Sequence, residues 1–203
     1  MKAAIILKDA YLKDFNNCYD IIVGADRGSL HALNNGIIPD ISIGDFDSVN
    51  EIEFEKIKNN SKKLIQLNKI KDSSDTHEAI NLVSNYDEIH IFGGIKGKRI
   101  EHLFSNLIDL INYPNVSIMD EDSLIETIND NNYIVKENYK FVSLYAVEDS
   151  VIDLTGFKYE LNNYDLKMKD PLGISNEITH NPFIKINSGK ILIIYTKDDG
   201  EIK

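Results

Sequence analysis

Short apolar runs alternate with stretches of helical periodicity through the first 120 residues of the chain. The runs predict buried strands, because they are short, rich in isoleucine and bounded by polar residues or glycine; they are AAIIL (3–7), DIIVG (20–24), ISI (41–43), KLIQL (63–67), EIHIF (88–92) and VSIMD (116–120). Helical periodicity covers the segments between them, at 27–35, 51–60, 75–86 and 100–113. Strands that alternate with helices predict a mostly parallel sheet.

The pattern changes after about Leu124, where short strands follow one another and turn-forming groups separate them. The expected strands are YIVKE, KFVSLYAV, SVIDLTG, EITH, FIKIN and KILIIYT. A run of strands after alternating strands and helices indicates a separate C-terminal β-sandwich or barrel. We therefore expect an α/β fold with two domains, a mostly parallel α/β domain at 1–125 and an all-β domain at 126–203.

The composition describes an acidic protein of 203 residues, with 22 lysine and arginine residues against 33 aspartate and glutamate residues and a formal net charge of −11. No basic block interrupts this balance, so we expect no nucleic-acid partner. Cys18 is the only cysteine, which excludes an internal disulfide framework and a cysteine-based zinc site. The apolar run at 3–7 is too short for a signal peptide, and no segment matches a membrane-spanning helix. We expect a cytoplasmic protein without a membrane partner.

The residues directly after the apolar runs carry the candidate chemistry, because ligands of open parallel sheets bind beyond the carboxyl ends of the strands. GDFDS at 44–48 follows one such run. In an extended segment, Asp45 and Asp47 point to the same side and can converge on one cation, while Phe46 turns into the protein. Paired carboxylates without histidine or cysteine nearby suit Mg²⁺. The alternative is a turn in which the aspartates cap the helix that begins near Glu51.

A second cluster, KDSSDTHE, occupies residues 71–78. Asp75 and Glu78, three residues apart, fit a helix-capping arrangement. A carboxylate at this helix start can also complete a metal site or accept a proton from a substrate hydroxyl. Capping and catalysis are compatible roles for the same residue.

The third cluster, GGIKGKRIEH at 93–102, combines glycines with basic residues. Glycines let the backbone approach a phosphate, and the helix that begins near Ile100 directs free amide groups toward it. Lys96, Lys98 and Arg99 add positive charge, and the planar guanidinium of Arg99 suits phosphate oxygens. The segment matches neither the P-loop nor the GxGxxG pattern, and the alternative is a solvated basic loop.

Six stretches of the chain together resemble the thiamine pyrophosphokinase family, in its order and at its spacing: GADRG (24–28), GIIPDISIGDFDS (36–48), KDSSDTHEAI (71–80), GGIKGKRIEHLFSN (93–106), GFKYEL (156–161) and GISNE (173–177). The resemblance implies an N-terminal nucleotide-binding domain, a C-terminal β-sandwich for thiamine binding and dimerisation, and a homodimer with active sites at the subunit interface. It also implies the reaction, in which ATP and thiamine give AMP and thiamine diphosphate with Mg²⁺.

The resemblance assigns roles by position. It implies that the catalytic and metal-binding residues are Asp45, Asp47 and Asp75, with Asp75 as the preferred acceptor of the hydroxyl proton or as a metal ligand. The residues expected near ATP and its phosphates are Asp26, Arg27, Gly94, Lys98, Arg99 and His102, and those facing the vitamin are Ser175 and Asn176. The family usually reads GGRxDH where this chain has Lys98 in place of a glycine and Glu101 in place of an aspartate. Neither change removes a metal carboxylate.

Three other functions compete with this interpretation. A pyrophosphokinase acting on another hydroxymethylated substrate, such as a pterin, would have the same α/β half, and GISNE in the β half favours thiamine. A non-catalytic nucleotide or thiamine sensor could lose its metal carboxylates, whereas this chain retains Asp45, Asp47 and Asp75. A structural interaction module explains neither the glycines nor the aspartates at successive strand ends.

Overall fold

The computed structural model describes residues 1–70, 72–97, 99–129, 131–170 and 173–198. The fold is of the mixed α/β class, as predicted, and the chain separates into two compact units, Met1–Asp120 and Glu121–Lys203. This break comes slightly before the expected division at residue 125, because the strand Ser123–Ile128 pairs within the second unit.

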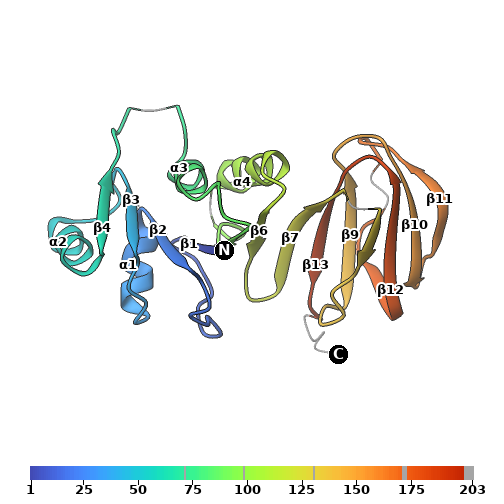
Figure 1. Cartoon of the computed structure of the whole chain (residues 1–203), viewed down its shortest axis with the longest axis horizontal. Coiled ribbons are helices and arrows are strands. Elements are labelled where there is room, and N and C mark those ends of the chain that lie inside the picture. Colours follow the sequence, from blue (N-terminus) through green and yellow to red (C-terminus); the bar gives the residue numbers. More distant parts are fainter. Residues whose placement is uncertain (71, 98, 130, 171–172, 199–203) are drawn as a thin grey trace. The chain divides into compact units, whose positions relative to one another are not determined.

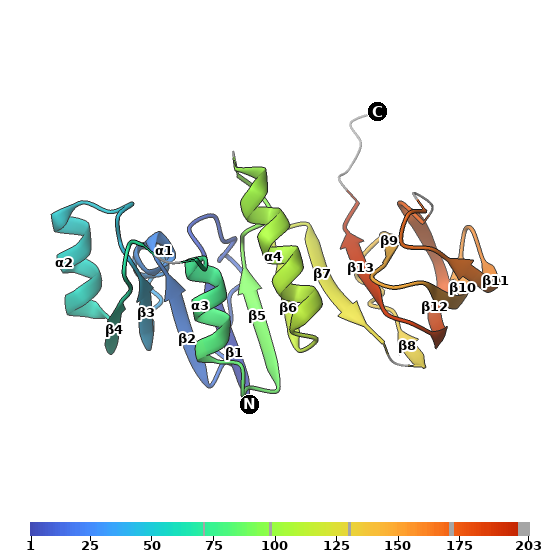
Figure 2. The ribbon, with the colours of Figure 1, turned by 90° about the horizontal axis from the view of Figure 1, so that it is seen from above.

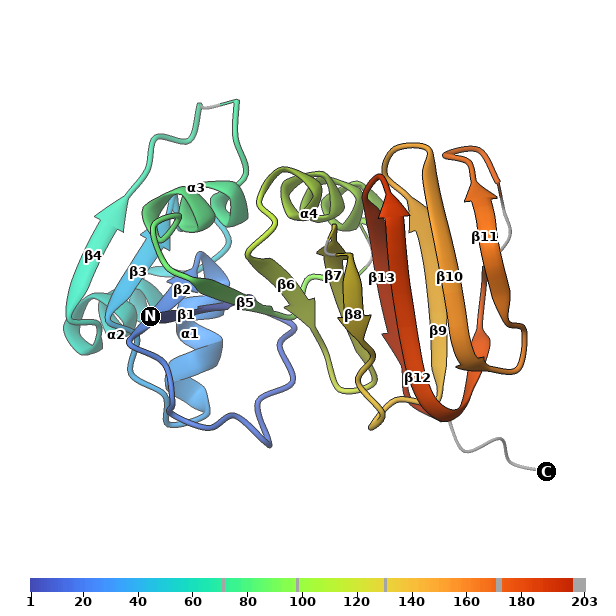
Figure 3. The same ribbon diagram turned by 45° about the vertical axis from the view of Figure 1, so that its right-hand side comes forward.

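The first unit alternates strands and helices, as the apolar pattern predicts. Its elements are β1 (Lys2–Ile6), β2 (Ile21–Ala25), α1 (Arg27–Asn34), β3 (Ile41–Gly44), α2 (Glu51–Asn60), β4 (Lys63–Gln66), α3 (Asp75–Leu82), β5 (Glu88–Phe92), α4 (Ile100–Asn112) and β6 (Val116–Met119). The strands pair in parallel in the order β6-β5-β1-β2-β3-β4. Figures 1 and 3 show α1 and α2 on one face of this sheet and α3 and α4 on the other.

The centre of the first sheet is fully buried. Ile5 and Ile6 of β1, Ile89 and Ile91 of β5, and Ile118 of β6 are all 0% exposed. Strands buried on both faces are typical of a parallel sheet covered by helices on each side. Burial of one such isoleucine stabilises the fold by about 1.5–3 kcal/mol, so the strand ends are held firmly in place.

Helices α2 and α3 are capped by residues other than the expected aspartates. Asn50 caps α2, because its side chain accepts a hydrogen bond from the Glu53 amide, so the alternative in which the aspartates of GDFDS cap this helix is wrong. Ser74 caps α3 by accepting from the His77 amide at 3.1 Å, and this leaves Asp75 in the first helical position. Figure 2 shows α3 and α4 side by side over the sheet. Among the described residues, no helix is long and apolar enough to cross a membrane.

All regular elements described in the second unit are strands. They are β7 (Ser123–Ile128), β8 (Asn132–Ile134), β9 (Phe141–Ala146), β10 (Ser150–Phe157), β11 (Leu161–Leu166), β12 (Asn176–Ser188) and β13 (Ile191–Thr196). One group of antiparallel strands runs β7-β13-β9, and another runs β11-β10-β12 with β8 on the other side of β12. The start of β12 pairs with β9 and links the two groups.

Strand β12 combines two strands that the sequence predicts separately, EITH and FIKIN. The Asn181–Pro182 pair between them looks like a turn signal. The structure accommodates the pair with a local irregularity, in which Asn181 has a φ of 43° and the register opposite β10 shifts. Gly156 of β10 lies against this point, since a Cβ atom there would be 2.0 Å from the His180 carbonyl oxygen.

Candidate active site

Three carboxylates meet at the carboxyl edge of the parallel sheet. Asp26 follows β2, Asp45 follows β3, and Asp75 opens α3. One oxygen of each carboxylate lies within 4.8 Å of the others, and all three residues are half-buried. Like charges at this separation repel one another, and the repulsion is larger in a half-buried site than in open water. We call Asp26, Asp45 and Asp75 the acidic group.

Asp26 holds one carboxylate oxygen without a hydrogen-bond partner. The Ser48 hydroxyl donates to Oδ2 at 2.7 Å, whereas Oδ1 is buried and accepts no hydrogen bond from the described residues. The backbone at Asp26 has a φ of 49°, and its amide donates to the Ile43 carbonyl oxygen at 2.7 Å. This close approach of two strand ends depends on Gly44, because a Cβ atom there would lie 2.9 Å from the Asp26 Cα.

The acidic group fits a hard divalent cation. Its donors are carboxylate oxygens, the ligands that Mg²⁺ prefers over nitrogen and sulfur. A buried acceptor without a donor costs about 1–3 kcal/mol or more when it is charged, and a bound cation offsets that cost at Asp26 Oδ1. The residues present are therefore suited to the expected metal.

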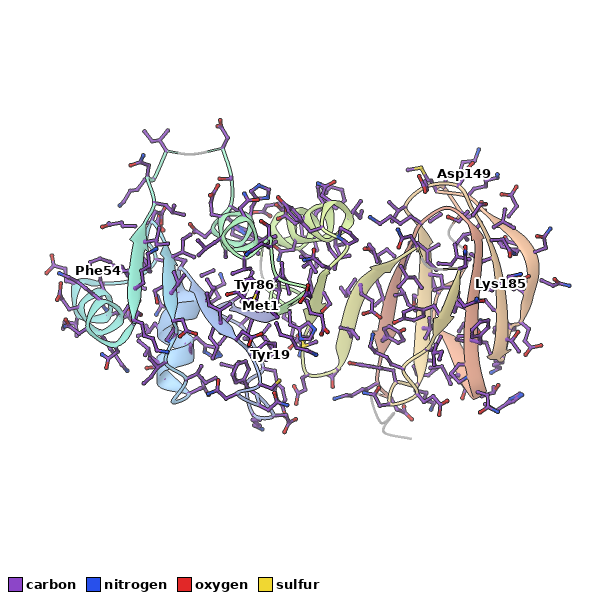
Figure 4. All side chains as sticks on the ribbon, viewed as in Figure 1. Met1, Tyr19, Phe54, Tyr86, Asp149 and Lys185 are labelled. Atoms are coloured by element: carbon purple, nitrogen blue, oxygen red, sulfur yellow. The ribbon has the colours of Figure 1, made fainter. Side chains whose placement is uncertain are left out.

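The GDFDS segment is not extended, contrary to the expectation that Asp45 and Asp47 point to the same side of an extended segment. Phe46 has a φ of 56°, which breaks the alternation. The ring of Phe46 does turn into the protein, as predicted, and lies 5.4 Å from the ring of Phe54 on α2, which Figure 4 labels. Asp47 is exposed and does not join the acidic group, although its amide donates to Asp45 Oδ1 at 3.1 Å. Its role as a metal ligand stays a prediction.

The glycine-rich segment after β5 is fixed to its surroundings through Gly94. The Gly94 amide donates to Asp9 Oδ1 at 3.0 Å, and its carbonyl oxygen accepts from Asn106 Nδ2 at 3.1 Å. The same loop carries Lys96, whose Nζ lies 3.3 Å from Oδ2 of the nearly buried Asp120. This loop is thus held by Asp9 of the segment after β1, Asn106 of α4 and Asp120, which directly follows β6. The expected contact between Gly94 and a phosphate stays a prediction.

The basic residues at the start of α4 lie on the surface. Arg99 Nε donates to Glu101 Oε1 at 2.7 Å, and the Arg99 side chain is 68% exposed. The hydrogen bond from Arg99 holds the pKa of Glu101 below its usual value. His102 is exposed as well, and Lys98 lies outside the described residues. The phosphate-binding roles expected of these residues stay predictions.

Arg27, the other arginine expected near phosphate, is engaged with the loop before α2. Its Nη1 donates to the Ser48 carbonyl oxygen at 2.6 Å, and its Nη2 lies 3.2 Å from Glu53 Oε1. The guanidinium therefore ties the start of α1 to the start of α2. Any contact between Arg27 and a phosphate would have to form alongside these two hydrogen bonds.

The second unit holds the two residues expected to face the vitamin. Asn176 is 6% exposed, and its Oδ1 accepts from the Tyr159 amide at 3.0 Å while its Nδ2 donates to the Tyr159 carbonyl oxygen at 2.7 Å. Ser175 has a φ of 53°, and its amide donates to the Ser143 hydroxyl at 2.9 Å. The Asn176 side chain thus fixes the backbone at Tyr159, whose own side chain is 66% exposed.

Both units match models of known protein domains. The model "thiamin pyrophosphokinase, catalytic domain" matches residues 12–120, and the model "thiamin pyrophosphokinase, vitamin B1 binding domain" matches residues 131–192. A thiamine pyrophosphokinase from Bacillus subtilis (strain 168) is 31% identical over 179 residues, a match that covers 83% of each chain. This chain belongs to the thiamin pyrophosphokinase family.

Solved structures of the family resemble the fold of this chain. The crystal structure of thiamine pyrophosphokinase from Bacillus subtilis has a TM-score of 0.85 at 27% identity, covering 98% of this chain and 100% of that chain. The thiamin pyrophosphokinase from Geobacillus thermodenitrificans has a TM-score of 0.84 at 27% identity, with coverage of 98% and 99%. The Candida albicans enzyme, at 18% identity and a TM-score of 0.79 over 97% of this chain and 90% of that one, shows likeness of fold alone.

The two thiamin pyrophosphokinase domain matches divide as the two units do. The catalytic-domain match contains the acidic group and ends at residue 120, where the first unit ends. The vitamin-binding match contains Ser175 and Asn176 and lies within the second unit. The family is therefore established, and the roles of the individual residues stay predictions.

Sequence reasoning missed several residues that shape the candidate site. Ser48 and Tyr159 lie inside stretches that resemble the family, but no role was expected of either. Asp9 follows the first strand, as Asp26 follows the second, so the rule for strand ends was a usable signal for it. No signal pointed to Asn106, because its contact with the glycine-rich segment depends on how α4 packs.

Proposed function

We propose that this chain transfers the diphosphoryl group of ATP to the hydroxyl of thiamine, giving thiamine diphosphate and AMP. Membership of the thiamin pyrophosphokinase family supports the reaction. The observation that carries the proposal for the site is the convergence of Asp26, Asp45 and Asp75 within 4.8 Å at the carboxyl edge of the sheet. The first unit serves as the nucleotide-binding domain in this account.

The acidic group holds Mg²⁺, with Asp47 as a further candidate ligand from the adjacent turn. When bound, Mg²⁺ neutralises the charge on the phosphate oxygens of ATP. The bare Oδ1 of Asp26 and the oxygen-only donor set support this assignment. The carboxylates also favour the positively charged thiazolium ring of thiamine, which a basic pocket would repel.

Asp75 is the preferred acceptor for the proton of the thiamine hydroxyl. Ser74 and not Asp75 caps α3, and one oxygen of the Asp75 carboxylate lies with those of Asp26 and Asp45. Transfer requires the hydroxyl oxygen to approach the β-phosphorus of ATP in line with the departing AMP oxygen. Asp75 acts either as this acceptor or as a metal ligand, and the kinetics of its variants distinguish the two.

The segment between β5 and α4 provides the phosphate contacts. α4 begins with Arg99 at its cap position, whose side chain makes no capping hydrogen bond. The amide groups at a helix N-terminus favour an anion. Arg99 adds its guanidinium, and we also propose contacts from Gly94, Lys98 and His102. The Glu101 carboxylate competes with phosphate for Arg99.

The second unit binds the vitamin. We propose that it is a β-sandwich, which is supported by its two groups of antiparallel strands and their link through β12. Tyr159 offers the ring that stacks on thiamine, since its side chain is exposed while two hydrogen bonds with the Asn176 side chain fix its backbone. Ser175 adds a hydroxyl in the adjacent turn.

We also propose that the protein is a homodimer and acts in the cytoplasm, where ATP is available. The homodimer rests on the resemblance to the family. Sedimentation equilibrium tests the assembly, with a mass twice that of one chain as the expected result. A mass equal to that of one chain at micromolar concentration would contradict it.

The reaction is tested by incubating purified protein with ATP, Mg²⁺ and thiamine and separating the products by chromatography. Equal amounts of AMP and thiamine diphosphate are expected, and omission of Mg²⁺ should stop their formation. A thiamine analogue without the hydroxyl group is the matched control and should give no AMP. Release of ADP together with thiamine monophosphate would show the transfer of a single phosphoryl group and contradict the proposal.

A further inference from the structure

Asp26 differs from the other members of the acidic group in how its carboxylate is held. Its Oδ2 is hydrogen-bonded, whereas its Oδ1 is buried without a partner among the described residues. The two oxygens of a carboxylate are chemically equal, and rotation about the Cβ–Cγ bond exchanges them. A neighbouring group must therefore determine which of the two oxygens lacks a hydrogen-bond donor.

The neighbouring group is the hydroxyl of Ser48, which donates to Oδ2 of Asp26 at 2.7 Å. This bond joins the turn after β3 to the turn after β2. With Oδ2 engaged, Oδ1 is the oxygen that lacks a protein donor. Hydrogen-bond partners of this kind fix the orientation of metal ligands in other proteins.

Ser48 is in turn held by Arg27 at the start of α1, and Arg27 is held by Glu53 in the first turn of α2. Arg27 Nη1 donates to the Ser48 carbonyl oxygen at 2.6 Å, and Arg27 Nη2 donates to Glu53 Oε1 at 3.2 Å. The other oxygen of Glu53 accepts from the Asn50 amide at 3.0 Å within the capping box of α2. A continuous series of hydrogen bonds therefore runs from the first turn of α2 to the carboxylate of Asp26.

We propose that Ser48, Arg27 and Glu53 form a brace that positions Asp26 as a metal ligand. In this role Arg27 is a positioning residue, and its guanidinium does not contact phosphate. The inference rests on the proposed function, because it takes the acidic group to hold a divalent cation. It assigns no direct contact with the cation to any of the three residues of the brace.

Binding of Mn²⁺ tests the brace without turnover. The loss of the free-ion signal in electron paramagnetic resonance measures affinity in the presence of α,β-methylene-ATP, an analogue in which the bond broken during diphosphoryl transfer is replaced. Ser48→Ala should weaken Mn²⁺ binding about tenfold. Ser48→Thr keeps the hydroxyl and should bind almost as well as the wild type. Unchanged affinity in Ser48→Ala would overturn the proposal, as would the absence of Mn²⁺ binding by the wild type.

A double-mutant cycle tests whether Arg27 and Glu53 act in series. Glu53→Gln removes the charge that faces Arg27 while keeping a residue suited to the capping box. Both Glu53→Gln and Arg27→Ala should weaken Mn²⁺ binding, and the double variant should bind no more weakly than Arg27→Ala alone. Glu55→Gln on the same helix, where Glu55 faces Lys58 at 3.4 Å, is the matched control and should be unchanged.

The possible failures are distinguishable. Effects of Arg27→Ala and Glu53→Gln that multiply in the double variant would refute the brace. So would a loss of ATP affinity in Arg27→Ala with unchanged Mn²⁺ affinity, which would return Arg27 to a phosphate contact. If the brace variants bind Mn²⁺ normally while the wild type forms thiamine diphosphate and AMP, the brace is refuted. The proposed function is then unaffected. A wild type that forms neither product contradicts the function itself.

Discussion

The acidic group of the first unit and the start of β12 in the second unit hold polar side chains in opposite ways. Asp26 keeps a buried carboxylate oxygen without a partner among the described residues, whereas both polar groups of the Asn176 amide are bonded to the backbone of Tyr159. An unsatisfied charged oxygen lowers stability and is available to a ligand, while a satisfied amide stabilises the fold. Two positions selected from the sequence therefore differ in whether their polar atoms are already hydrogen-bonded within the described part of the protein.

The largest effect is expected at the acidic group. Asp45→Asn should lower kcat about 100-fold, or about 2.7 kcal/mol, because it removes a charged oxygen ligand. The Tm should stay the same or rise, since the change relieves repulsion and preserves an acceptor for the Asp47 amide. Asp47→Asn is the matched control outside the group, and we expect a smaller loss of kcat. An equal loss would place Asp47 among the ligands, and a large fall in Tm for Asp45→Asn would assign it a structural role.

Asn176→Ala should have the opposite profile. The backbone amide and carbonyl of Tyr159 would both lose their hydrogen bonds to Asn176, so the free energy of unfolding should fall by about 2 kcal/mol. For a chain of this size, that loss corresponds to a Tm lower by about 4–8 °C. Thermal denaturation measures the effect, and the exposed Asn162 provides a control in Asn162→Ala. An unchanged Tm together with a higher KM for thiamine would contradict the structural role and return Asn176 to direct contact with the vitamin.

Tyr159 sharpens the comparison, because its backbone is fixed by Asn176 while its ring is exposed. Tyr159→Ala should raise the KM for thiamine about tenfold, which is the scale of one aromatic stacking contact. The KM for ATP and the Tm should remain close to those of the wild type. Tyr159→Phe keeps the ring and should behave like the wild type. Similar values of KM for thiamine in all three proteins would exclude the stacking role.

The smallest effect is expected at the surface pair of Arg99 and Glu101. Glu101→Gln should raise the affinity for ATP about two- to threefold near pH 8, because it frees Arg99 from an exposed ion pair. The pKa of Glu101 is lowered by that pair, so the pair is intact above the usual pKa of a glutamate and is lost as the pH falls through the lowered value. The difference between variant and wild type should therefore disappear at acidic pH. A lower affinity in Glu101→Gln at pH 8 would mean that Glu101 supports ATP binding.

Most of the fold of the first unit could be predicted from the sequence. Its central strands are short isoleucine-rich runs buried on both faces, and the four helices start at their predicted positions. The second unit was harder to predict. β11 reads LNNYDL and is largely exposed, so it carries no apolar run, and β7 directly follows the last strand of the first unit without a turn signal of its own.

The site could be predicted only at the level of its carboxylates. The rule for strand ends selects Asp26 and Asp45 without knowledge of the structure. The direction of each side chain depends on positive φ values at Asp26 and Phe46, which residues other than glycine rarely adopt. For the same reason, no sequence pattern indicated the bond from Ser48 to Asp26, which requires both turns to be folded.

The central claim is that this chain transfers a diphosphoryl group at the acidic group, and labelled ATP tests it most directly. Reactions with thiamine and Mg²⁺ are run in parallel with ATP labelled at the β-phosphorus and with ATP labelled at the γ-phosphorus. Both labels should appear in thiamine diphosphate at the same rate, and Asp45→Asn should slow both equally. Transfer of the γ label alone would show that a single phosphoryl group moves. Transfer of both labels at the wild-type rate by Asp45→Asn would show that the reaction does not depend on the acidic group.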